Sequence, residues 1–389
     1  MKLEGVKVLD MSAFLPGPHM TMMMADHGAD VIMVEPANGV GEPVREIGER
    51  TPDGISVWFR NIARGKRSLK LNLKDPAGVE LLLKLAETAD VFVEAFRPGV
   101  VTRLGVGYEA VAARNPKIVY CSISAFGQTG QHVQKPAHDL VVQAMTGLMD
   151  LGRGLSDGQP APPPVPFADA SASLMALSAI LMALYRREKT GEGDYIDMSM
   201  YNAAIAWTPN VLGPTFGKGE APQPKQMRSF GGAAMNAIYP TSDGGYIVIG
   251  GSEVKFAENL LSAFGRIDLL DYARIPPGDA QEPLKAYFRE TFSSNTLSHW
   301  TRFLEPVDCC WAPVRNLQEA FDDPFTEERG MVFTDAAGNR HVGPPIRFAK
   351  EPPRPNPALP SFGQHSEEIA VEAGIAPADV QRLKDKGAI

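Results

Sequence analysis

Residues 6–35 have the sequence VKVLDMSAFLPGPHMTMMMADHGADVIMVE, and this stretch decides the fold class. An apolar run at 6–11 predicts a short buried strand, and a second run at 29–35 predicts another. The segment 20–27 between them is rich in methionine and predicts a helix that ends at Gly28. Strand, helix and strand within so few residues are typical of a parallel sheet, in which a helix connects one strand to the next.

The same alternation continues along the first half of the chain. Apolar segments at 68–73, 90–96 and 117–124 predict three further strands, and the connections between them have the length of helices. Asp75 and Pro76 cap and open one of these helices, because proline is favoured at the first helical position. The pattern predicts an α/β fold with a doubly wound parallel sheet.

The second half has a different organisation. A proline-rich loop at 156–166 leads into a long apolar helix at 168–187, which we expect to cross between domains and to end at 189–193. The segments NAIYPT and YIVIG, joined by a DGG turn at 243–245, predict a hairpin, and helices are expected near 254–264, 281–292 and 296–304. We therefore expect a large domain at 1–200, a smaller α+β domain at 225–325, and a C-terminal segment at 326–389 that returns to the large domain.

Composition excludes several classes of protein. The 389 residues carry a formal net charge of −8, which argues against a nucleic-acid or anionic-membrane partner. Three cysteines without a CxxC pair, and histidines without metal-ligand spacing, predict neither a disulfide scaffold nor a metal site. The start MKLEGVKVLDMS does not resemble a signal peptide, and the longest apolar run, 174–185, is shorter than the ~18 residues of a membrane span. We expect a cytoplasmic protein.

The motif after the first strand limits the choice of ligand. That strand is followed by LPGP at 15–18, and a GxGxxG fingerprint for a nicotinamide or flavin cofactor is absent there. The chain also lacks a P-loop and a GxSxG nucleophile motif. A doubly wound sheet still binds ligands at the carboxyl ends of its strands.

Basic residues are densest between 60 and 74. One interpretation is a solvated loop and strand face. The other is a clamp for phosphate groups, because arginine and lysine suit phosphate oxygens. The run contains Arg60, Arg64, Lys66, Arg67, Lys70 and Lys74. Arg97 adds a cation at the end of a predicted strand, where ligands gather.

Four polar residues stand near predicted helix starts. Asp139 suits an N-cap, and His138 beside it is either a surface histidine or a base with its ring near the helix N-terminus. Asp169 opens the long apolar helix as a plain N-cap or as a positioned nucleophile or base. Glu253 follows Gly250 and Gly251, and taken alone it is another helix-start acid. The residues alone leave these alternatives open.

Ordered motifs extend over nearly the whole chain, and they are LEGVKVLDMS, LPGP, ADHGADVIMVEP, RGKRSLKLNLKDPAG, ADVFVEAFRPGV, NPKIVYCSISAFGQTG, HDLVVQAMTGLM, FADASASLMALSAILMALYRREKTGEGDYIDMSM and YPTSDGGYIVIGG. In these motifs the chain resembles the family III CoA-transferases, the CaiB/BaiF family, which also contains 2-methylacyl-CoA racemases.

This resemblance implies a Rossmann-like large domain and a small domain, in an interlocked homodimer. It implies that CoA and acyl-CoA are substrates and that no cofactor is tightly bound. The nucleotide and phosphates of CoA would lie against the basic residues of the large domain, which are Arg64, Lys66, Arg67, Lys74 and Arg97.

The resemblance implies two possible mechanisms. In the transferases an aspartate at the position of Asp169 is the nucleophile and carries an aspartyl-CoA intermediate, and backbone amides at Gly250 and Gly251 would stabilise oxyanions. In the racemases the same aspartate acts with a histidine, here His138, and Glu253 stands where the racemases have a glutamate. The residues after His138, DLVVQ, differ from the racemase pattern DxNY. We favour CoA transfer to a carboxylic acid, and racemisation at C2 of an acyl-CoA is the alternative reaction. A protein that binds acyl-CoA without turnover is the alternative from a different functional class.

Overall fold

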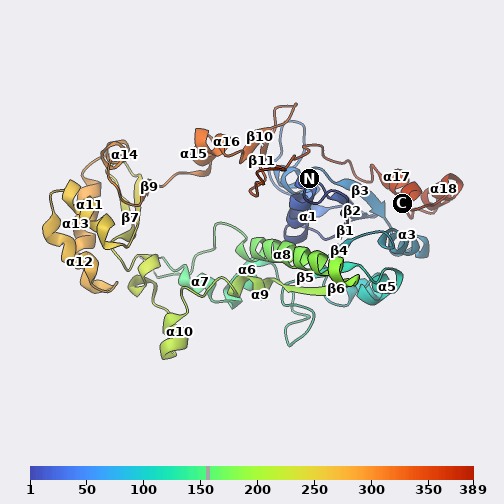
Figure 1. Ribbon diagram of the computed structural model, residues 1–389, viewed down its shortest axis with the longest axis horizontal. Coiled ribbons are helices and arrows are strands. Elements are labelled where there is room, and N and C mark those ends of the chain that lie inside the picture. Colours follow the sequence, from blue (N-terminus) through green and yellow to red (C-terminus); the bar gives the residue numbers. More distant parts are fainter. Residues whose placement is uncertain (155–157) are drawn as a thin grey trace. The chain divides into compact units, whose positions relative to one another are not determined.

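The computed structural model describes residues 1–154 and 158–389, and these form two compact units (Figure 1). The first unit contains Met1–Thr146, Pro164–Ala206 and Pro324–Ile389. The second contains Gly147–Pro163 and Trp207–Asp323. The chain therefore passes from one unit to the other at several places along its length.

A six-stranded parallel sheet forms the centre of the first unit. Its strand order is β3-β2-β1-β4-β5-β6, so β1 pairs with β2 on one side and with β4 on the other. The strands are β1 Lys7–Met11, β2 Asp30–Pro36, β3 Arg67–Leu71, β4 Val91–Glu94, β5 Val119–Ser124 and β6 Asp194–Ser199. This order is that of a doubly wound Rossmann-type sheet, and the expected fold class is confirmed. Strand β6, at the edge of the sheet, was not expected.

Helices cover both faces of this sheet. On one face a single apolar core joins the strands to α3 Pro76–Ala86, α5 Tyr108–Arg114, α17 Ser366–Glu372 and α18 Pro377–Asp385. On the other face lie α1 Pro16–Asp26, α2 Val57–Ala63, α8 Phe167–Thr190 and α9 Met200–Ile205. Because both faces are covered, every residue of β4 and β5 is buried. Shorter helices are α4 Val100–Arg103, α6 Asp139–Met145 and α16 Pro324–Glu328.

Helix α8 belongs entirely to the first unit, so the expectation that it crosses between domains was wrong. It packs against α1, α9, β5 and β6, and it ends at Gly191, which has the left-handed conformation that favours glycine. By length and composition α8 is apolar enough to cross a membrane, although 44% of its apolar window is buried within the protein. The core helix of a soluble protein can have the same length and apolar composition, so these properties of α8 are only weak evidence for a membrane span.

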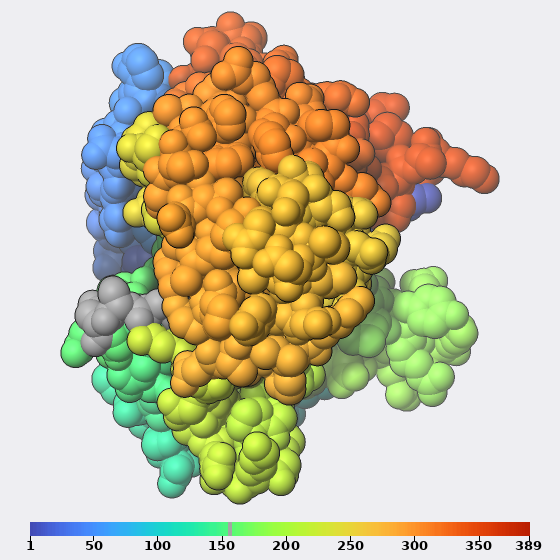
Figure 2. Space-filling model, turned by 90° about the vertical axis from the view of Figure 1, so that its left-hand side faces the viewer, coloured from blue at the N-terminus to red at the C-terminus, as the bar shows by residue number. Residues whose placement is uncertain are grey.

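The second unit is built around a small antiparallel sheet. Strands β7 Asn236–Pro240 and β8 Tyr246–Gly250 form the expected hairpin, and β9 Trp311–Pro313 pairs with β8. Its aromatic-rich core is packed by α11 Val254–Ala263, α12 Leu270–Arg274, α13 Glu282–Ser293 and α14 Leu297–Leu304. These helices give the yellow and orange surface in Figure 2. The remaining helices are α7 Leu148–Leu151, α10 Gly213–Lys218 and α15 Leu317–Phe321.

The limits of the two units differ from the expected ones. Residues 147–163 cluster with the second unit, because Leu151, Gly152 and Arg153 line a pocket with residues of β7 and β8. The longer segment of the second unit begins at Trp207 rather than at the expected residue 225. Of the expected loop at 156–166, the first two residues lie outside the described part of the chain, and 158–166 has neither helix nor strand.

The C-terminal segment covers the β3 edge of the sheet. The amide N–H of Lys70 donates to the Ser366 hydroxyl at 3.0 Å, and that of Asn72 donates to the Ala388 carbonyl at 2.8 Å. The same segment contributes the hairpin of β10 Val332–Thr334 and β11 Arg340–Val342. The outer edge of the sheet is thereby closed by residues that are distant in sequence.

Candidate active site

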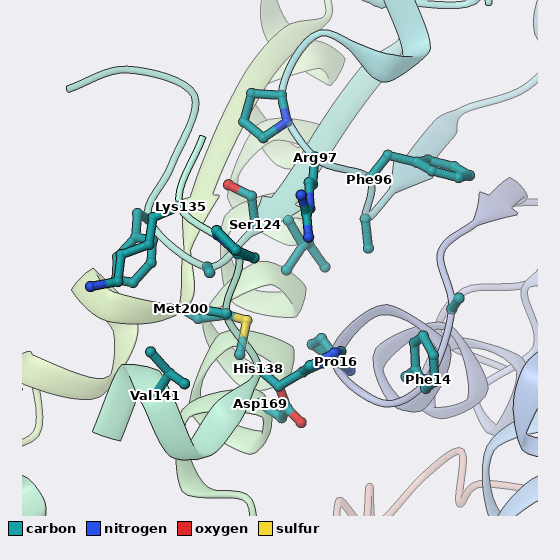
Figure 3. A pocket seen from close by; sticks show the side chains of 18 of the residues that line it. Phe14, Pro16, Phe96, Arg97, Ser124, Lys135, His138, Val141, Asp169 and Met200 are labelled. Carbon is teal, nitrogen blue, oxygen red and sulfur yellow. The ribbon is translucent and has the colours of Figure 1, made fainter. Parts of the chain in front are cut away.

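A pocket of about 390 Å³ lies at the carboxyl ends of β1, β4 and β5 (Figure 3). Its walls come from the segments that follow these strands, which include Phe14, Phe96 and Phe126. The strand order reverses between β1 and β4, and ligands of doubly wound sheets bind at such a switch point. His138 and Asp169 also line this pocket, so the structure brings these two expected site residues together.

Asp169 is the third residue of α8 and is not its N-cap, which is Pro166. Its side chain lines the pocket, and no described residue donates a hydrogen bond to its carboxylate. Burial, together with the nearby negative charge of Asp139, raises the pKa of Asp169 to about 7. A carboxyl group with this pKa exchanges its proton at neutral pH and is held in a partly desolvated place, as expected of a reactive group.

Asp139 caps a helix other than the one it begins. We expected it to be the N-cap of its own helix, but the N-cap of α6 is His138. The Asp139 carboxylate instead accepts hydrogen bonds from the amide N–H groups of Ala168 and Asp169, at 2.7 and 3.2 Å. The Gln143 side chain donates to its other oxygen at 2.7 Å. Asp139 therefore accepts hydrogen bonds from the free amide N–H groups in the first turn of α8. The N-cap residue Pro166 has no side-chain acceptor that could do so.

His138 presents its ring to the same pocket. The ring stands edge-on to that of Phe14, with 5.8 Å between the ring centroids and 75° between their planes. Figure 3 shows His138 and Asp169 together among the residues that line the pocket. An imidazole and a carboxylate in one pocket can share the transfer of a proton.

Two cations line the pocket. Arg97 follows β4, is exposed, and was expected from its place at a strand end. Lys135 lies three residues before His138 and was missed, because an isolated lysine in a polar segment has no distinguishing signal in a single sequence. Their positive charges suit the phosphate or carboxylate groups of a ligand.

Three of the other expected cations are paired with carboxylates. The guanidinium of Arg64 makes a bidentate pair with Asp26 at 2.6 and 3.0 Å, and both side chains are buried. Arg67 makes a bidentate pair with Asp30 and also contacts the carboxylates of Glu368 and Glu372. Neither arginine lines the pocket. Charge density in the sequence does not show which cations are already paired with carboxylates, and contact of these two arginines with CoA stays a prediction.

Lys66 is also internal. Its Nζ donates to the Asp10 carboxylate at 3.1 Å, to the Thr21 hydroxyl at 2.8 Å and to the Pro18 carbonyl at 2.8 Å, and the side chain is fully buried. It connects the segment before β3 to the end of β1 and to α1, and it is not among the residues that line the pocket. Lys74 is exposed and is not among the residues that line the pocket.

The N-terminus of α1 is a poor anion site. Pro16 and Pro18 lack an amide N–H, so Gly17 has the only free donor of its first turn. In dinucleotide-binding sheets the amides of this turn hold the pyrophosphate. With the LPGP motif, a phosphate group at this strand end would have few backbone donors, and side-chain cations would have to bind it instead.

The remaining expected residues belong to the second unit. Glu253 is the N-cap of α11 and is exposed. The Gly250 amide donates to the Cys310 carbonyl at 2.8 Å, so the expectation that it is a free oxyanion donor was wrong. A side chain at Gly251 would approach the Phe256 ring to 2.7 Å, which explains the glycine by close packing.

Within the described ranges, no cluster of three or more His, Cys, Asp or Glu side chains has the arrangement of a metal site.

Comparison with known proteins gives one consistent result. Residues 3–366 match the family described as CoA-transferase family III. The human succinyl-CoA:glutarate CoA-transferase is 32% identical over 95% of this chain and 85% of its own. The human alpha-methylacyl-CoA racemase is also 32% identical, over 98% of this chain and 96% of its own. A solved structure of a CAIB/BAIF family protein from Brucella suis superposes with a TM-score of 0.82 at 28% identity, over 95% of this chain and 99% of that one.

Proposed function

The chain belongs to CoA-transferase family III, an enzyme family that acts on CoA thioesters, and on that premise we propose that it moves CoA from an acyl-CoA to a carboxylic acid through Asp169. One observation carries the proposal. The Asp169 carboxylate lines the pocket at the switch point, while Asp139 caps the helix in its place. Asp169 is therefore free of the structural task that an aspartate at a helix start usually performs.

The reaction begins with attack by the Asp169 carboxylate on the thioester carbonyl of the donor. The carbon–sulfur bond breaks, CoA leaves as a thiolate, and a mixed anhydride of the acyl group and Asp169 remains. The thiolate then attacks the aspartyl carbonyl, which releases the donor acid as a carboxylate and leaves CoA on Asp169 as a thioester. The ionised form of Asp169 is the nucleophile, and its pKa of about 7 leaves a large share of it ionised at neutral pH.

The second half of the reaction repeats these steps with the acceptor. Its carboxylate attacks the aspartyl thioester and expels the CoA thiolate, which then attacks the acceptor's carbonyl carbon in the new anhydride. The products are the acceptor's CoA ester and the free Asp169 carboxylate. Arg97 and Lys135 would hold anionic groups of CoA or of the acids during both halves.

The test is a trapping experiment. The enzyme is incubated with an acyl-CoA, treated with hydroxylamine or borohydride, and the peptide that contains Asp169 is examined by mass spectrometry. A transferase gives a modified Asp169 and exchanges CoA only when a carboxylic acid is present. An unmodified Asp169 in an enzyme that is active under the same conditions would falsify the proposal.

Racemisation at C2 of an acyl-CoA is the second candidate. The observation that favours it is the presence of His138 and Asp169 in one pocket, because a racemase needs two groups that can remove and return a proton. In deuterated water a racemase incorporates deuterium at C2 without any acceptor acid. It also loses activity when His138 is replaced by Gln, and it leaves no adduct on Asp169.

We further propose that the enzyme works as an interlocked homodimer. Helix α8 exposes a stripe of apolar side chains on one of its faces, at Leu174, Leu181, Met182 and Tyr185, with Met182 and Tyr185 each 66% exposed. Residues spaced three, four and seven positions apart lie on one side of a helix. An exposed stripe of this kind on a long helix is suited to contact with a second chain.

A further inference from the structure

Phe14, in the segment between β1 and α1, has an unusual backbone conformation. It is the only non-glycine residue in the described ranges with a positive φ, at 67°. Residues with a side chain avoid this left-handed region, because Cβ comes too close to the following carbonyl oxygen. Such conformations persist only where neighbouring groups hold them, and they are often found at functional sites. Phe14 lines the candidate active site (Figure 3).

The group that holds Phe14 is the buried carboxyl of Glu42. The amide N–H of Phe14 donates to Glu42 Oε1 at 2.9 Å, and the N–H of Val44 reaches the same oxygen at 3.5 Å. Glu42 is 4% exposed, and its burial raises its pKa to about 7. A hydrogen bond to an ionised carboxylate is stronger than one to a neutral acceptor, so Glu42 is a firm anchor when ionised.

Glu42 is itself held from β2. Its amide donates to Glu35 Oε2 at 2.8 Å, and the Glu35 carboxylate forms a bidentate pair with Arg45 at 2.7 and 2.8 Å. Gly41 makes this turn possible, because a Cβ there would lie 2.3 Å from Glu35 Oε2 and 2.7 Å from the Phe362 ring. A rigid connection therefore leads from the sheet to the backbone of Phe14.

The connection ends at His138. The Phe14 ring meets the His138 ring edge-on at 5.8 Å, and no residue in the described part of the chain forms a hydrogen bond with that imidazole. We propose that Glu42 is a positioning residue, which holds Phe14 in its left-handed conformation so that the Phe14 ring fixes the imidazole of His138 in the pocket that Asp169 also lines. The inference deepens the proposed function, and its kinetic tests rest on that function.

The kinetic test compares Glu42→Ala and Glu42→Gln with a matched control, Asp75→Ala. Asp75 also accepts a backbone amide, from Ala77 at 2.8 Å, but it caps α3 and does not line the pocket. We expect Glu42→Ala to lower kcat at least ~10-fold with less than ~3-fold change in KM, because it disturbs geometry and leaves the binding groups in place. Glu42→Gln should retain most of the activity, since its amide oxygen can accept the same N–H. Asp75→Ala should lower only thermal stability.

A double-mutant cycle separates positioning from general stability. If Glu42 acts through Phe14, then Glu42→Ala should have less than ~2-fold further effect on kcat in a Phe14→Ala background. A purely structural role of Glu42 predicts the same loss of kcat in both backgrounds, and that result would overturn the inference.

A measurement that needs no turnover makes the inference independent of the proposed function. In protein with 13C-labelled histidine, the His138 signal is identified by its disappearance in His138→Gln. We expect Glu42→Ala to shift this signal, because the ring of Phe14 no longer lies at the same distance and angle, and Asp75→Ala to leave it in place. If Glu42→Ala does not fold, Glu42→Asp serves instead, since it keeps the carboxyl but shortens its reach. A His138 signal that is unchanged in the folded variant contradicts the inference, whether or not the protein transfers CoA.

Discussion

Asp169 and Asp139 both lie at the start of α8, and they make different contacts there. Asp139 accepts the amide hydrogen bonds at the start of α8, and Asp169 directs its carboxylate to the pocket. The two aspartates can therefore be tested separately, one for chemistry and the other for helix stability.

The first prediction concerns Asp169→Asn. Pro166 is the N-cap of α8, and Asp139 accepts the amide hydrogen bonds of its first turn. The variant should therefore fold with a thermal midpoint close to that of the wild type. The amide can neither attack a thioester nor transfer a proton, so kcat should fall at least ~10³-fold. Circular dichroism and steady-state kinetics check both parts. Near wild-type turnover would leave Asp169 without a catalytic role.

The second prediction concerns pH. The pKa of Asp169 is raised to about 7, first by burial and then by the charge of Asp139, and in the proposed mechanism the ionised form of Asp169 is the nucleophile. kcat/KM should therefore increase as the pH rises through about 7. Asp139→Asn removes the nearby negative charge and should move this rise to lower pH. If the dependence of kcat/KM on pH is the same in Asp139→Asn as in the wild type, the electrostatic coupling of the two carboxyl groups is contradicted.

The same shift of the Asp169 pKa affects stability with a definite sign. An unfolded aspartate has a pKa of about 4, so between about pH 4 and 7 the folded chain keeps a proton that the unfolded chain has released. The contribution of Asp169 to stability should thus fall as the pH rises through this window. Urea unfolding of the wild type and of Asp169→Asn at several pH values measures the difference.

The third prediction compares two arginines. Arg97→Glu should raise KM for acyl-CoA by ~10-fold or more, because it replaces a cation that lines the pocket by an anion. Arg67→Glu should leave KM unchanged but lower the thermal midpoint, because the new carboxylate would face those of Asp30, Glu368 and Glu372. Equal changes in KM for both variants would contradict a direct contact between Arg97 and acyl-CoA.

Local patterns in the sequence singled out three residues that line the pocket. Asp169, His138 and Arg97 stand at helix starts or strand ends, which are recognisable from the sequence, and their roles stay predictions. The burial of Arg64 and Lys66 in ion pairs could not be predicted, because their partners Asp26 and Asp10 lie on other elements and no local pattern indicates the pairing.

At the scale of elements, the start of α1 depends on an unusually close approach. A Cβ on Gly17 would lie 2.0 Å from the hydroxyl oxygen of Ser12, and the O–H group of Ser12 donates a hydrogen bond to the Asp10 carboxylate. The segment after β1 thus folds back tightly onto the helix that it begins. This close contact places Pro16 in the wall of the pocket.

The fourth prediction tests that contact. Gly17→Ala should destabilise the first unit by ~1–3 kcal/mol, because the methyl group must displace Ser12 or the backbone. Gly217→Ala in α10 is the control, since no atom lies within 4 Å of the added methyl group and alanine favours the helix. Thermal unfolding measures both. A loss of stability in Gly217→Ala as large as that in Gly17→Ala would contradict the steric explanation.

At the scale of the whole molecule, the fifth prediction concerns the apolar stripe on α8. Met182→Asp should convert a dimer into a monomer of 42.0 kDa, because it places a charge in the centre of the proposed contact. Val371→Asp on α17, where the valine is 48% exposed, is the matched control and should remain dimeric. Sedimentation equilibrium distinguishes the two states. A wild-type chain that sediments as a monomer would end the proposal.

The overall architecture was predicted more fully than its boundaries. Alternating apolar segments identified five strands of the large sheet, because buried parallel strands have a strong local signal. Strand β6 was missed, since it lies at the edge of the sheet and its residues are mostly polar or partly exposed. That residues 147–163 belong to the second unit was missed as well, because Leu151, Gly152 and Arg153 line a pocket with residues of β7 and β8, which are far away in the sequence.

The repeated passage of the chain between its two units has a consequence for synthesis on the ribosome. Residues 207–323 leave the exit tunnel before 324–389, which cover the β3 edge of the sheet. At ~5–20 residues per second, the nascent first unit waits several seconds with that edge uncovered while the second unit is being made. An uncovered strand edge can pair with other chains, so we expect the nascent chain to be exposed to aggregation during this interval.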